Sequence, residues 1–516
     1  MIETELKITL DPDEAARLAR SPALAALREG PRRRERLVSI YIDTAAHALA
    51  GAGIALRLRR IGRRWVQTVK RGRRAGGAGL YSHEEIEIPA PGGRLALDGP
   101  DPSGAYAAIA EAAGGAPLQP VFETRVERAA ERLRLPEGVV ELALDRGEVV
   151  AGAARAPILE AEIELVEGEV AAVFALARRL FPRGPVRFAT ANKSALGYRI
   201  ARGEPPPDPA RPRPAGAVAF EPEASVETAA RDVLRDCFAQ VSQNLVVTLV
   251  SDDHEGPHQL RVGLRRLRTA LAVFGPSLGA SRLAGLSDAA RDLGRVVGRL
   301  RDADVLIDEV VAGAAGPGLD EPARAALDAA LAARRESVRD EVRARLAGPE
   351  TTGFVFDLLE AIEARGWLDP ADYAQTGRLA APVADLAPGL LDARRRKAMR
   401  RGRGIEERDA EALHELRKEL KKLRYAAEML APVFPRKKVD AFLRPLKSLQ
   451  DAFGSLNDGA MAAEKLAGHG APGHGDPAAQ RAVGWTLGVL AARAETDRPR
   501  LFERWRAFAD TPPFWR

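Results

Sequence analysis

Up to about Ile200, hydrophobic and polar residues alternate one by one along several short segments. The clearest of these segments are 2–9, 55–59, 65–70, 84–88, 139–145 and 158–166. Alternation with a period of two is typical of a β-strand, because successive side chains of a strand point to opposite faces of its sheet. The first part of the chain is therefore predicted to be rich in β-sheet.

From about Glu221 onward the pattern changes to long stretches of Ala, Leu, Arg and Glu with the period of an α-helix. Breaks that contain Gly and Pro separate these stretches, for example at 348–350 and 468–473. Between the two parts lies a proline-rich segment that can join neither a sheet nor a helix and is expected to form an extended spacer. We predict an α+β multidomain protein with a β domain over 1–202, a linker over 203–216 and an all-α domain over 217–516.

The amino-acid composition excludes only a few classes of binding partner and site. The chain has 78 Lys+Arg against 72 Asp+Glu, a net charge of +6, so local clusters of charge must attract any polyanion. The single cysteine, Cys237, excludes an intramolecular disulfide framework and a cysteine-rich zinc site. No apolar stretch approaches the roughly 18 residues that a membrane-spanning helix needs. We expect a cytoplasmic protein with no membrane partner.

Charged residues two apart share one face of the predicted strands. In Glu3-Thr-Glu5-Leu-Lys7 the three charged side chains project together. The same spacing recurs in Arg57 and Arg59, Thr68 and Lys70, Glu85 and Glu87, Glu141 and Asp145, and Glu160, Glu162 and Glu164. One such strand is most simply a solvated face. If the sheet closes into a barrel, the repetition predicts an interior with carboxylates for hard cations and Lys or Arg for phosphoryl oxygens.

The order of these motifs resembles the CYTH superfamily, the triphosphate tunnel metalloenzymes, over residues 1 to about 200. Residues 3–7 match its ExExK signature, and further matching motifs lie at 41–44, 56–59, 67–70, 85–87, 144–148, 160–165 and 192–194. The resemblance implies an eight-stranded antiparallel β tunnel with flanking helices. It also implies that basic residues of the tunnel bind triphosphate and that acidic ones bind Mg²⁺ or Mn²⁺.

The resemblance assigns roles to the matching positions. Phosphate contacts are implied for Lys7, Arg57, Arg59, Lys70 and Lys193. Metal or water ligands are implied at Glu3, Glu5, Glu85, Glu87, Asp145, Glu160 and Glu162. The expected catalytic residues are Glu3, Glu5, Lys7 and Lys70.

Two positions depart from the family pattern or leave it unclear. Where the family places inward cations, Arg125 and Arg128 are three residues apart, so a regular strand cannot face both inward, and we prefer Arg128 as a substrate ligand. His83 stands where many members have arginine, and it is left unassigned.

The helical part contains an internal duplication. His258-Gln-Leu-Arg261-Val-Gly-Leu-Arg265-Arg-Leu-Arg268 reappears 156 residues later as His414-Glu-Leu-Arg417-Lys-Glu-Leu-Lys421-Lys-Leu-Arg424, and residues 293–302 match 449–458 at the same offset. A constant offset indicates duplicated helical bundles. On a helix, each motif places its basic residues on one face. The first stripe is His258, Arg261, Arg265 and Arg268, and the second stripe is His414, Arg417, Lys421 and Arg424.

The two stripes resemble those of the CHAD domain, a conserved-histidine α-helical domain, over roughly residues 220–510. The resemblance implies a pair of four-helix bundles whose basic surface, with Lys447 as a further contact, binds inorganic polyphosphate. Although a basic stripe is more often a solvated face, the histidine that begins each copy favours a functional reading, as does Pro257, which suits a first helical turn. Metal binding by His254 and His258 is disfavoured because Pro257 lies between them and no cysteine is near.

The leading hypothesis is a metal-dependent inorganic triphosphatase that converts tripolyphosphate to pyrophosphate and phosphate and binds polyphosphate through its helical domain. An organic triphosphatase acting on thiamine triphosphate or a nucleotide, and an adenylyl cyclase, stay open as alternatives. So does a nonenzymatic protein that binds polyphosphate or associates with polyphosphate granules in the cytoplasm. Nucleic-acid binding is disfavoured because few aromatic residues accompany the stripes. The oligomeric state is left open.

Overall fold

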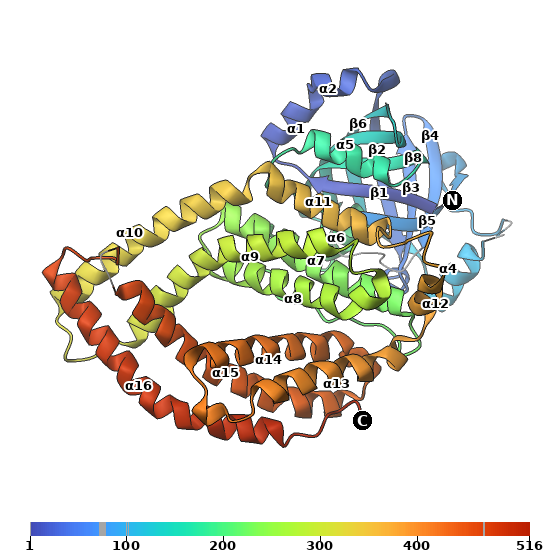
Figure 1. Cartoon of the computed structure of the whole chain (residues 1–516). Coiled ribbons are helices and arrows are strands. Elements are labelled where there is room, and N and C mark those ends of the chain that lie inside the picture. The colour runs from blue at the N-terminus through green and yellow to red at the C-terminus, as the bar shows by residue number, and fades with distance from the viewer. Residues whose placement is uncertain (1, 72–78, 100, 102, 468–469) are drawn as a thin grey trace. The chain divides into compact units, whose positions relative to one another are not determined.

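A computed structural model describes the chain except for residues 1, 72–78, 100, 102 and 468–469 (Figure 1). The chain divides into two compact units. The first, which we call the β unit, comprises Met1–Arg211 and Pro349–Gly366. The second, the helical unit, comprises Pro212–Gly348 and Trp367–Arg516.

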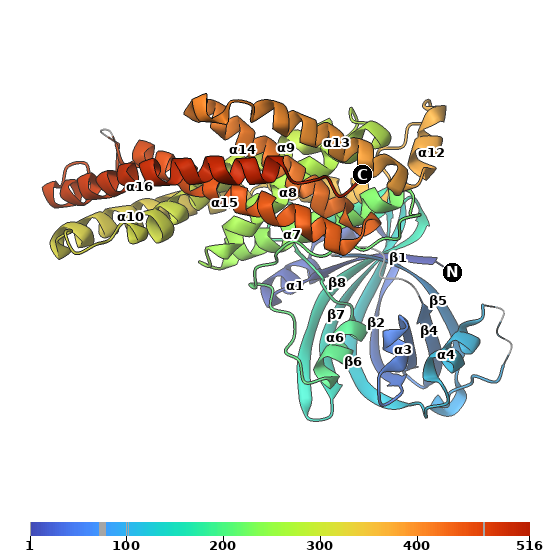
Figure 2. The same cartoon turned by 90° about the horizontal axis from the view of Figure 1, so that it is seen from below.

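The β unit is built on one antiparallel sheet that curls (Figure 2). Its strands are β1 (Ile2–Thr9), β2 (Arg28–Asp43), β3 (Ile54–Ile61), β4 (Arg64–Arg71), β5 (Leu80–Pro89), β6 (Gln119–Leu135), β7 (Gly138–Ala151), β8 (Ala154–Gly168) and β9 (Arg187–Phe188). The strands follow the order β5-β4-β3-β2-β6-β7-β8-β1-β9, and β5 also pairs with β1. This extra pairing joins the sheet into a ring of the eight longer strands.

The expected number of strands, eight, was wrong, because the sheet has nine. The ninth, β9, is only two residues long and pairs with Ile8 and Thr9 of β1. On this edge of β1, the pairing with β5 covers only Ile2 to Leu6. The short strand β9 therefore supplies backbone hydrogen bonds to the part of the edge that β5 leaves unpaired.

Helices and hydrophobic residues cover the sheet of the β unit. The helical segments are α1 (Pro12–Ala19), α2 (Pro22–Ala25), α3 (Ala48–Gly51), η1 (Pro91–Gly93), α4 (Ala105–Ala113), α5 (Ala171–Leu180), α6 (Lys193–Ala201) and α11 (Pro349–Glu363). On β1, Leu6 and Ile8 are buried and so are Glu5 and Lys7, so this strand is covered on both faces. The alternation found in the sequence therefore separates an apolar face from a charged face. At β1 the charged face is also buried from solvent.

Helix α11 belongs to the β unit although it lies in the middle of the helical half of the sequence. Arg178 of α5 pairs with Asp357 at 2.6 Å and with Glu360 at 2.7 Å. The buried ring of Phe356 packs edge-on against Phe188, with ring centroids 5.7 Å apart. These contacts attach a segment of the predicted helical domain to the β unit.

The helical unit begins at Pro212, within the proline-rich segment. Residues 203–216 contain neither helix nor strand. The backbone of Arg213 exchanges two hydrogen bonds with the side chain of Asn244, and the N–H of Gly216 donates to Asp236 at 3.0 Å. Side chains of the first helix of the unit thus satisfy backbone groups that the prolines keep out of regular structure.

The duplicated motifs occupy equivalent helices of the helical unit. Its helical segments are α7 (Val226–Val250), α8 (Glu255–Leu278), α9 (Ala284–Val305), η2 (Leu306–Val311), α10 (Glu321–Leu346), α12 (Tyr373–Ala380), α13 (Val383–Arg401), η3 (Ile405–Glu407), α14 (Ala410–Leu430), η4 (Ala431–Val433), α15 (Arg436–Leu466) and α16 (Pro477–Ala509). The first stripe lies on α8 and the second on α14, while the other repeated segment lies on α9 and α15. Helix α8 packs on α9, α14 packs on α15, and α8 also contacts α14 (Figure 1).

Several helices of this unit begin at capping residues. The side chains of Ser225, Asp320, Asp409 and Asp476 accept backbone N–H groups at the starts of α7, α10, α14 and α16. Such caps satisfy donors that a helix cannot satisfy internally. Among the described residues, no helix combines the length and the apolar character that crossing a membrane requires.

Candidate functional site

The strand register brings the predicted residues of the β unit onto one face of the sheet. Lys7 lies opposite Glu162, and Arg128 lies opposite Asp145. Further opposed pairs are Arg57 and Thr68, Thr68 and Glu87, Lys70 and Glu85, and Asp145 and Glu160. Residues directly opposite each other on antiparallel strands point to the same side. We call this side, with Lys7, Asp145 and Glu162 near its middle, the charged face.

Three carboxylates form the acidic centre of the charged face. Asp145 of β7 and Glu160 and Glu162 of β8 are each at most 8% exposed, and their ligand oxygens lie within 4.8 Å of one another. The ammonium group of Lys193 is 2.6 Å from Asp145 and 2.8 Å from Glu162, and it also bonds Glu160. Asn192 caps α6 by accepting the N–H of Ala195, which fixes Lys193 at the first position of the helix.

Two more cations contact the same carboxylates. The guanidinium of Arg128 donates to both oxygens of Asp145, at 2.8 and 2.7 Å, and also bonds Glu162. Lys7 is 2.8 Å from Glu5 and bonds Glu162 as well. Although burial disfavours charge, Lys193, Lys7 and Arg128 hold the pKa of Glu162 well below its usual range. Burial likewise opposes the charge of Lys7, yet Glu162 and Glu5 hold its pKa well above the ordinary value.

A second group of paired charges lies around β4 and β5. Lys70 is 2.9 Å from Glu3 and 2.6 Å from Glu85. Arg57 is 3.0 Å from Glu85 and 3.9 Å from the half-exposed Glu87, which also accepts the hydroxyl of Thr68. Burial and a hydrogen bond with Glu3 raise the pKa of Glu85. The predicted metal ligands, which are acidic, and the predicted phosphate ligands, which are basic, therefore alternate in space across the charged face.

Arg59 differs from the other cations of the face because no carboxylate pairs with it among the described residues. Its Nε donates to the hydroxyl of Ser39 at 3.1 Å. Burial and the neighbouring cations Arg57 and Arg128 lower the pKa of Arg59 to about 10. Positive charge is therefore in excess around this side chain, which suits an anion.

Three further residues belong to the face but were not among the predicted site residues. Burial and the carboxylates of Glu3 and Glu5 raise the pKa of Glu164 to about 8. The buried Tyr41 stacks on Phe122, and although burial opposes ionisation, Arg57 and Arg59 lower its pKa. Ser39 is the third. The alternation already put Glu164 on one face with Glu160 and Glu162, although no role was assigned to it, and the same rule would have found Ser39 and Tyr41, which precede Asp43 at the same spacing.

Arg125 and His83 were the unclear positions of the sequence. Arg125 is exposed and pairs with Glu123 and, at 3.8 Å, with Glu148, away from the charged face. The strand register sets His83 opposite Glu3, but the His83 side chain lies outside the described residues.

The chemistry of the three-carboxylate centre fits a hard divalent cation. Mg²⁺ and Mn²⁺ prefer oxygen ligands, and Asp145, Glu160 and Glu162 offer them in a buried group small enough to surround one ion. The ammonium of Lys193 shows that this position already holds a positive charge.

In the helical unit, the two basic stripes meet where α8 contacts α14. Burial, then Arg265 and Arg417, lower the pKa of Lys421 to about 6. Burial and Arg261 lower the pKa of Arg265 to about 10, with Arg417 contributing in the same direction. We call Arg261, Arg265, Arg417 and Lys421 the basic cluster. Within the part of the chain that the structure describes, neither Arg265 nor Lys421 has an acidic partner in an ion pair, whereas Arg261 pairs with Asp302 at 2.6 Å.

The other predicted residues of the stripes lie around this cluster. His414 is exposed and its Nδ1 lies 3.0 Å from Asn457, while burial and Arg301 lower the pKa of the partly buried His258. Arg268 is exposed, and its charged neighbours are residues of α9. Arg424 and the exposed Lys447 share Glu428, at 3.9 and 3.5 Å.

Comparison with known proteins identifies two domains. The family model of the CYTH domain matches residues 1–198, and that of the CHAD domain matches residues 232–467. An inorganic triphosphatase of Haemophilus influenzae is 27% identical over 201 residues, which are 38% of this chain and 54% of that protein. The chain therefore spans about half the length of this relative.

Two further proteins resemble more of the chain. An uncharacterized protein of Mycobacterium tuberculosis is 27% identical over 483 residues, covering 84% of this chain and 82% of that protein. The solved structure of the CHAD domain from the plant Ricinus communis is 25% identical with a TM-score of 0.50, covering 59% of this chain and 98% of that chain.

Proposed function

The chain carries a CYTH domain followed by a CHAD domain, and from this premise we propose that it is a metal-dependent inorganic triphosphatase whose helical unit binds polyphosphate. The observation that carries the proposal is the charged face itself. It combines a buried three-carboxylate centre with guanidinium and ammonium groups, and its positive charge is in excess at Arg59. The related inorganic triphosphatase supports this choice of substrate.

The basic residues of the charged face would bind the phosphates. These residues are Lys7, Arg57, Arg59, Lys70, Arg128 and Lys193. Guanidinium and ammonium groups match phosphoryl oxygens in charge and geometry, and their bonds to an anion are stronger than neutral hydrogen bonds. Arg59 would gain a charged partner from an anion, because among the described residues only the hydroxyl of Ser39 accepts a hydrogen bond from its side chain.

The acidic residues would hold the metal. Asp145, Glu160 and Glu162 form the proposed centre. Glu3, Glu5, Glu85 and Glu87 are the further candidate ligands to the ion or its water. A bound Mg²⁺ or Mn²⁺ supplies charge neutralisation at the phosphorus and orientation of a water molecule.

Hydrolysis forms a bond between a water oxygen and phosphorus and breaks one phosphoanhydride bond, giving pyrophosphate and phosphate. Negative charge grows on the departing pyrophosphate, and preorganised cations stabilise such charge without reorganisation. Lys7 and Lys70 are suited to this role, since Glu5 orients the first and Glu3 the second. We therefore assign Glu3, Glu5, Lys7 and Lys70 to catalysis.

The basic cluster would bind polyphosphate. Its cations repel each other, and a polyanion laid between α8 and α14 would remove the repulsion and accept hydrogen bonds from several side chains at once. The proposed contacts are the two stripes together with Lys447: His258, Arg261, Arg265, Arg268, His414, Arg417, Lys421, Arg424 and Lys447. If the helical unit binds polyphosphate, we further propose that the protein is located in the cytoplasm and associates with polyphosphate granules.

A substrate panel tests the proposed activity. Purified full-length protein is given tripolyphosphate, ATP or thiamine triphosphate at equal concentration with Mg²⁺ or Mn²⁺, and phosphate, pyrophosphate and cyclic AMP are measured. We expect phosphate release to be fastest from tripolyphosphate. Faster turnover of an organic triphosphate or formation of cyclic AMP would identify one of the alternative enzymes, and no turnover of any substrate would leave only a binding protein.

A further inference from the structure

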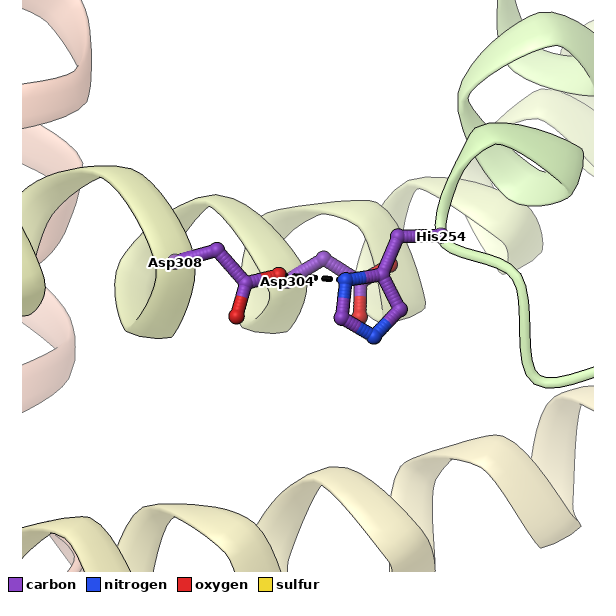
Figure 3. Close-up of side chains that lie close together, drawn as sticks. All are labelled: His254, Asp304 and Asp308. Carbon is purple, nitrogen blue, oxygen red and sulfur yellow. Dashed lines mark ion pairs between the residues drawn. The ribbon is translucent and has the colours of Figure 1, made fainter.

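A histidine and two aspartates, none of them part of the basic cluster, converge in the helical unit (Figure 3). His254 lies at the start of α8, Asp304 lies near the end of α9, and Asp308 follows in the π-helical turn η2. Their ligand atoms lie within 4.8 Å of one another, and Nδ1 of His254 is 2.5 Å from a carboxylate oxygen of Asp308. Asp304 and Asp308 are four residues apart, and the imidazole lies beside both of them.

Asp304 is the unusual member of this group. It is only 1% exposed, yet within the described residues neither of its carboxylate oxygens accepts a hydrogen bond. A buried carboxylate without partners costs more than almost any other polar group in a protein interior. Burial raises its pKa, and no side chain among the described residues donates a hydrogen bond to its oxygens. A ligand that brings positive charge directly to these oxygens would satisfy them.

Arg335 neutralises the carboxylates of this group only in part. Its guanidinium is 3.5 Å from Asp308 and 3.4 Å from Nε2 of His254, whereas Asp304 receives no bond from it. Because a guanidinium only donates hydrogen bonds, this contact favours the tautomer of His254 with its proton on Nδ1, beside Asp308. A metal ion bound through Nδ1 would displace this proton.

The internal duplication provides a natural comparison for this group. At the offset of 156 residues, the positions that correspond to His254, Asp304 and Asp308 hold Ala410, Ala460 and Glu464. Two of the three ligands are therefore missing from the second copy, while the basic stripe is present in both copies. The group formed by His254, Asp304 and Asp308 is thus not part of the repeated basic motif. A function confined to the first copy would explain why the second copy lacks it.

We propose that His254, Asp304 and Asp308 bind one divalent transition-metal ion, for which Zn²⁺ is the best match. One imidazole and two carboxylates are ligands that Zn²⁺ takes together, and three protein ligands leave a position for water. The imidazole makes this donor set softer than the carboxylate centre of the β unit, so the two sites would differ in metal preference. The ion would tie the start of α8 to the end of α9 and bring positive charge to the carboxylate of Asp304.

Metal binding to the full-length chain tests this proposal. Protein treated with a chelator is titrated with Zn²⁺ and, separately, Mn²⁺ by calorimetry in buffers of different ionisation enthalpy. We expect the wild type to bind one more Zn²⁺ than Asp304→Asn and to release a proton on binding. The matched control is Glu464→Gln, which removes the equivalent carboxylate of the second copy from an exposed position and should bind Zn²⁺ like the wild type.

A spectroscopic measurement keeps the proposal testable if Asp304→Asn does not fold. The visible spectrum of Co²⁺ bound to the wild type is compared with that of His254→Ala, which changes a partly exposed residue. We expect the visible d–d bands of Co²⁺ to shift or weaken when the imidazole ligand is lost, and binding to be at least about tenfold weaker. The same Zn²⁺ stoichiometry in the wild type and Asp304→Asn, or an unchanged Co²⁺ spectrum in His254→Ala, would overturn the proposal.

Discussion

The charged face and the basic cluster both bury lysines and arginines, but they surround them differently. On the charged face almost every cation touches a carboxylate, as Lys7 touches Glu5 and Glu162. In the basic cluster Lys421 is surrounded by cations, among them Arg265 and Arg417. Burial acts in the same direction in both places, so the difference between them comes from the neighbours.

The pKa values of two lysines express this difference. The pKa of Lys7 is held well above its ordinary value, while that of Lys421 is lowered to about 6. A site whose charges are already balanced can position a metal and a substrate with little rearrangement. A site with unbalanced positive charge gains by binding a polyanion, and among the described residues the basic cluster includes no group of carboxylates like that of Asp145, Glu160 and Glu162. This difference supports the proposal that the β unit hydrolyses the substrate and that the helical unit binds polyphosphate.

The largest expected effect is the loss of turnover in Glu162→Gln. This carboxylate contacts Lys7, Arg128 and Lys193, and the substitution removes its charge from the proposed metal centre. We expect kcat/KM for tripolyphosphate to fall about 10³-fold. The control is Glu127→Gln, at an exposed residue that pairs with Arg36 at 3.2 Å. Turnover that stays near the wild-type rate in Glu162→Gln would remove the carboxylate centre from the mechanism.

A smaller loss is expected in Arg59→Gln. Charge-assisted hydrogen bonds contribute about 1.5–3 kcal/mol, so kcat/KM for tripolyphosphate should fall roughly 10- to 100-fold. Because Arg57 and Arg128 repel Arg59, the variant should unfold at the wild-type temperature or above it. The exposed Arg60 next to it, changed to Gln, is the control. Loss of stability together with activity would mean that Arg59 serves the fold and not the substrate.

In the helical unit the expected change is in affinity. Lys421→Gln should weaken binding of long-chain polyphosphate about tenfold and reduce the dependence of binding on salt. The exposed Lys418 on the same helix already pairs with Glu415 at 2.6 Å, so Lys418→Gln should change affinity by less than about twofold. Both affinities can be measured by fluorescence anisotropy with labelled polyphosphate. Equal losses in the two variants would indicate a general effect of net charge.

The smallest expected effect is on stability. The pKa of Lys421 is about 6 in the folded protein against an ordinary 10.5, so the unfolded chain binds the extra proton between these values. The free energy of unfolding should therefore rise with pH across this window, and the charged lysine destabilises the fold most below pH 6. Near pH 6 the unfolding temperature of Lys421→Met should exceed that of the wild type by a few degrees, at about 2–4 °C per kcal/mol. Near pH 10 the two unfolding temperatures should be almost equal. Parallel melting curves for the two proteins at all pH values would contradict this.

Much of the charged face was predictable because a strand places every second residue on one side. This rule puts Lys7 on one face with Glu5 and puts Glu162 on one face with Glu160, whereas the position of Lys7 opposite Glu162 depends on the pairing of β1 with β8. The duplication likewise predicted two equivalent basic helices. Their meeting at one cluster required the contact between α8 and α14, which no local pattern encodes.

Other features depend on contacts between residues far apart in the chain. The sequence prediction included helix α11 in the all-α domain, whereas its place in the β unit rests on contacts with Arg178 and Phe188, which precede it by more than 160 residues. The group around Asp304 was missed for a similar reason. The sequence drew attention to His254 and its neighbour His258, whereas the partners of His254 lie on another helix. The ninth strand was missed because two residues are too short for any periodic pattern.

The most direct test of the account is the product balance with tripolyphosphate. Full-length protein is incubated with tripolyphosphate and either Mg²⁺ or Mn²⁺, and again with excess chelator, while phosphate and pyrophosphate are followed over time. We expect the two products to appear in equal amounts with at least one of the metals, and we expect chelation to stop their formation. No release with either metal, or release that persists undiminished in chelator, would contradict it.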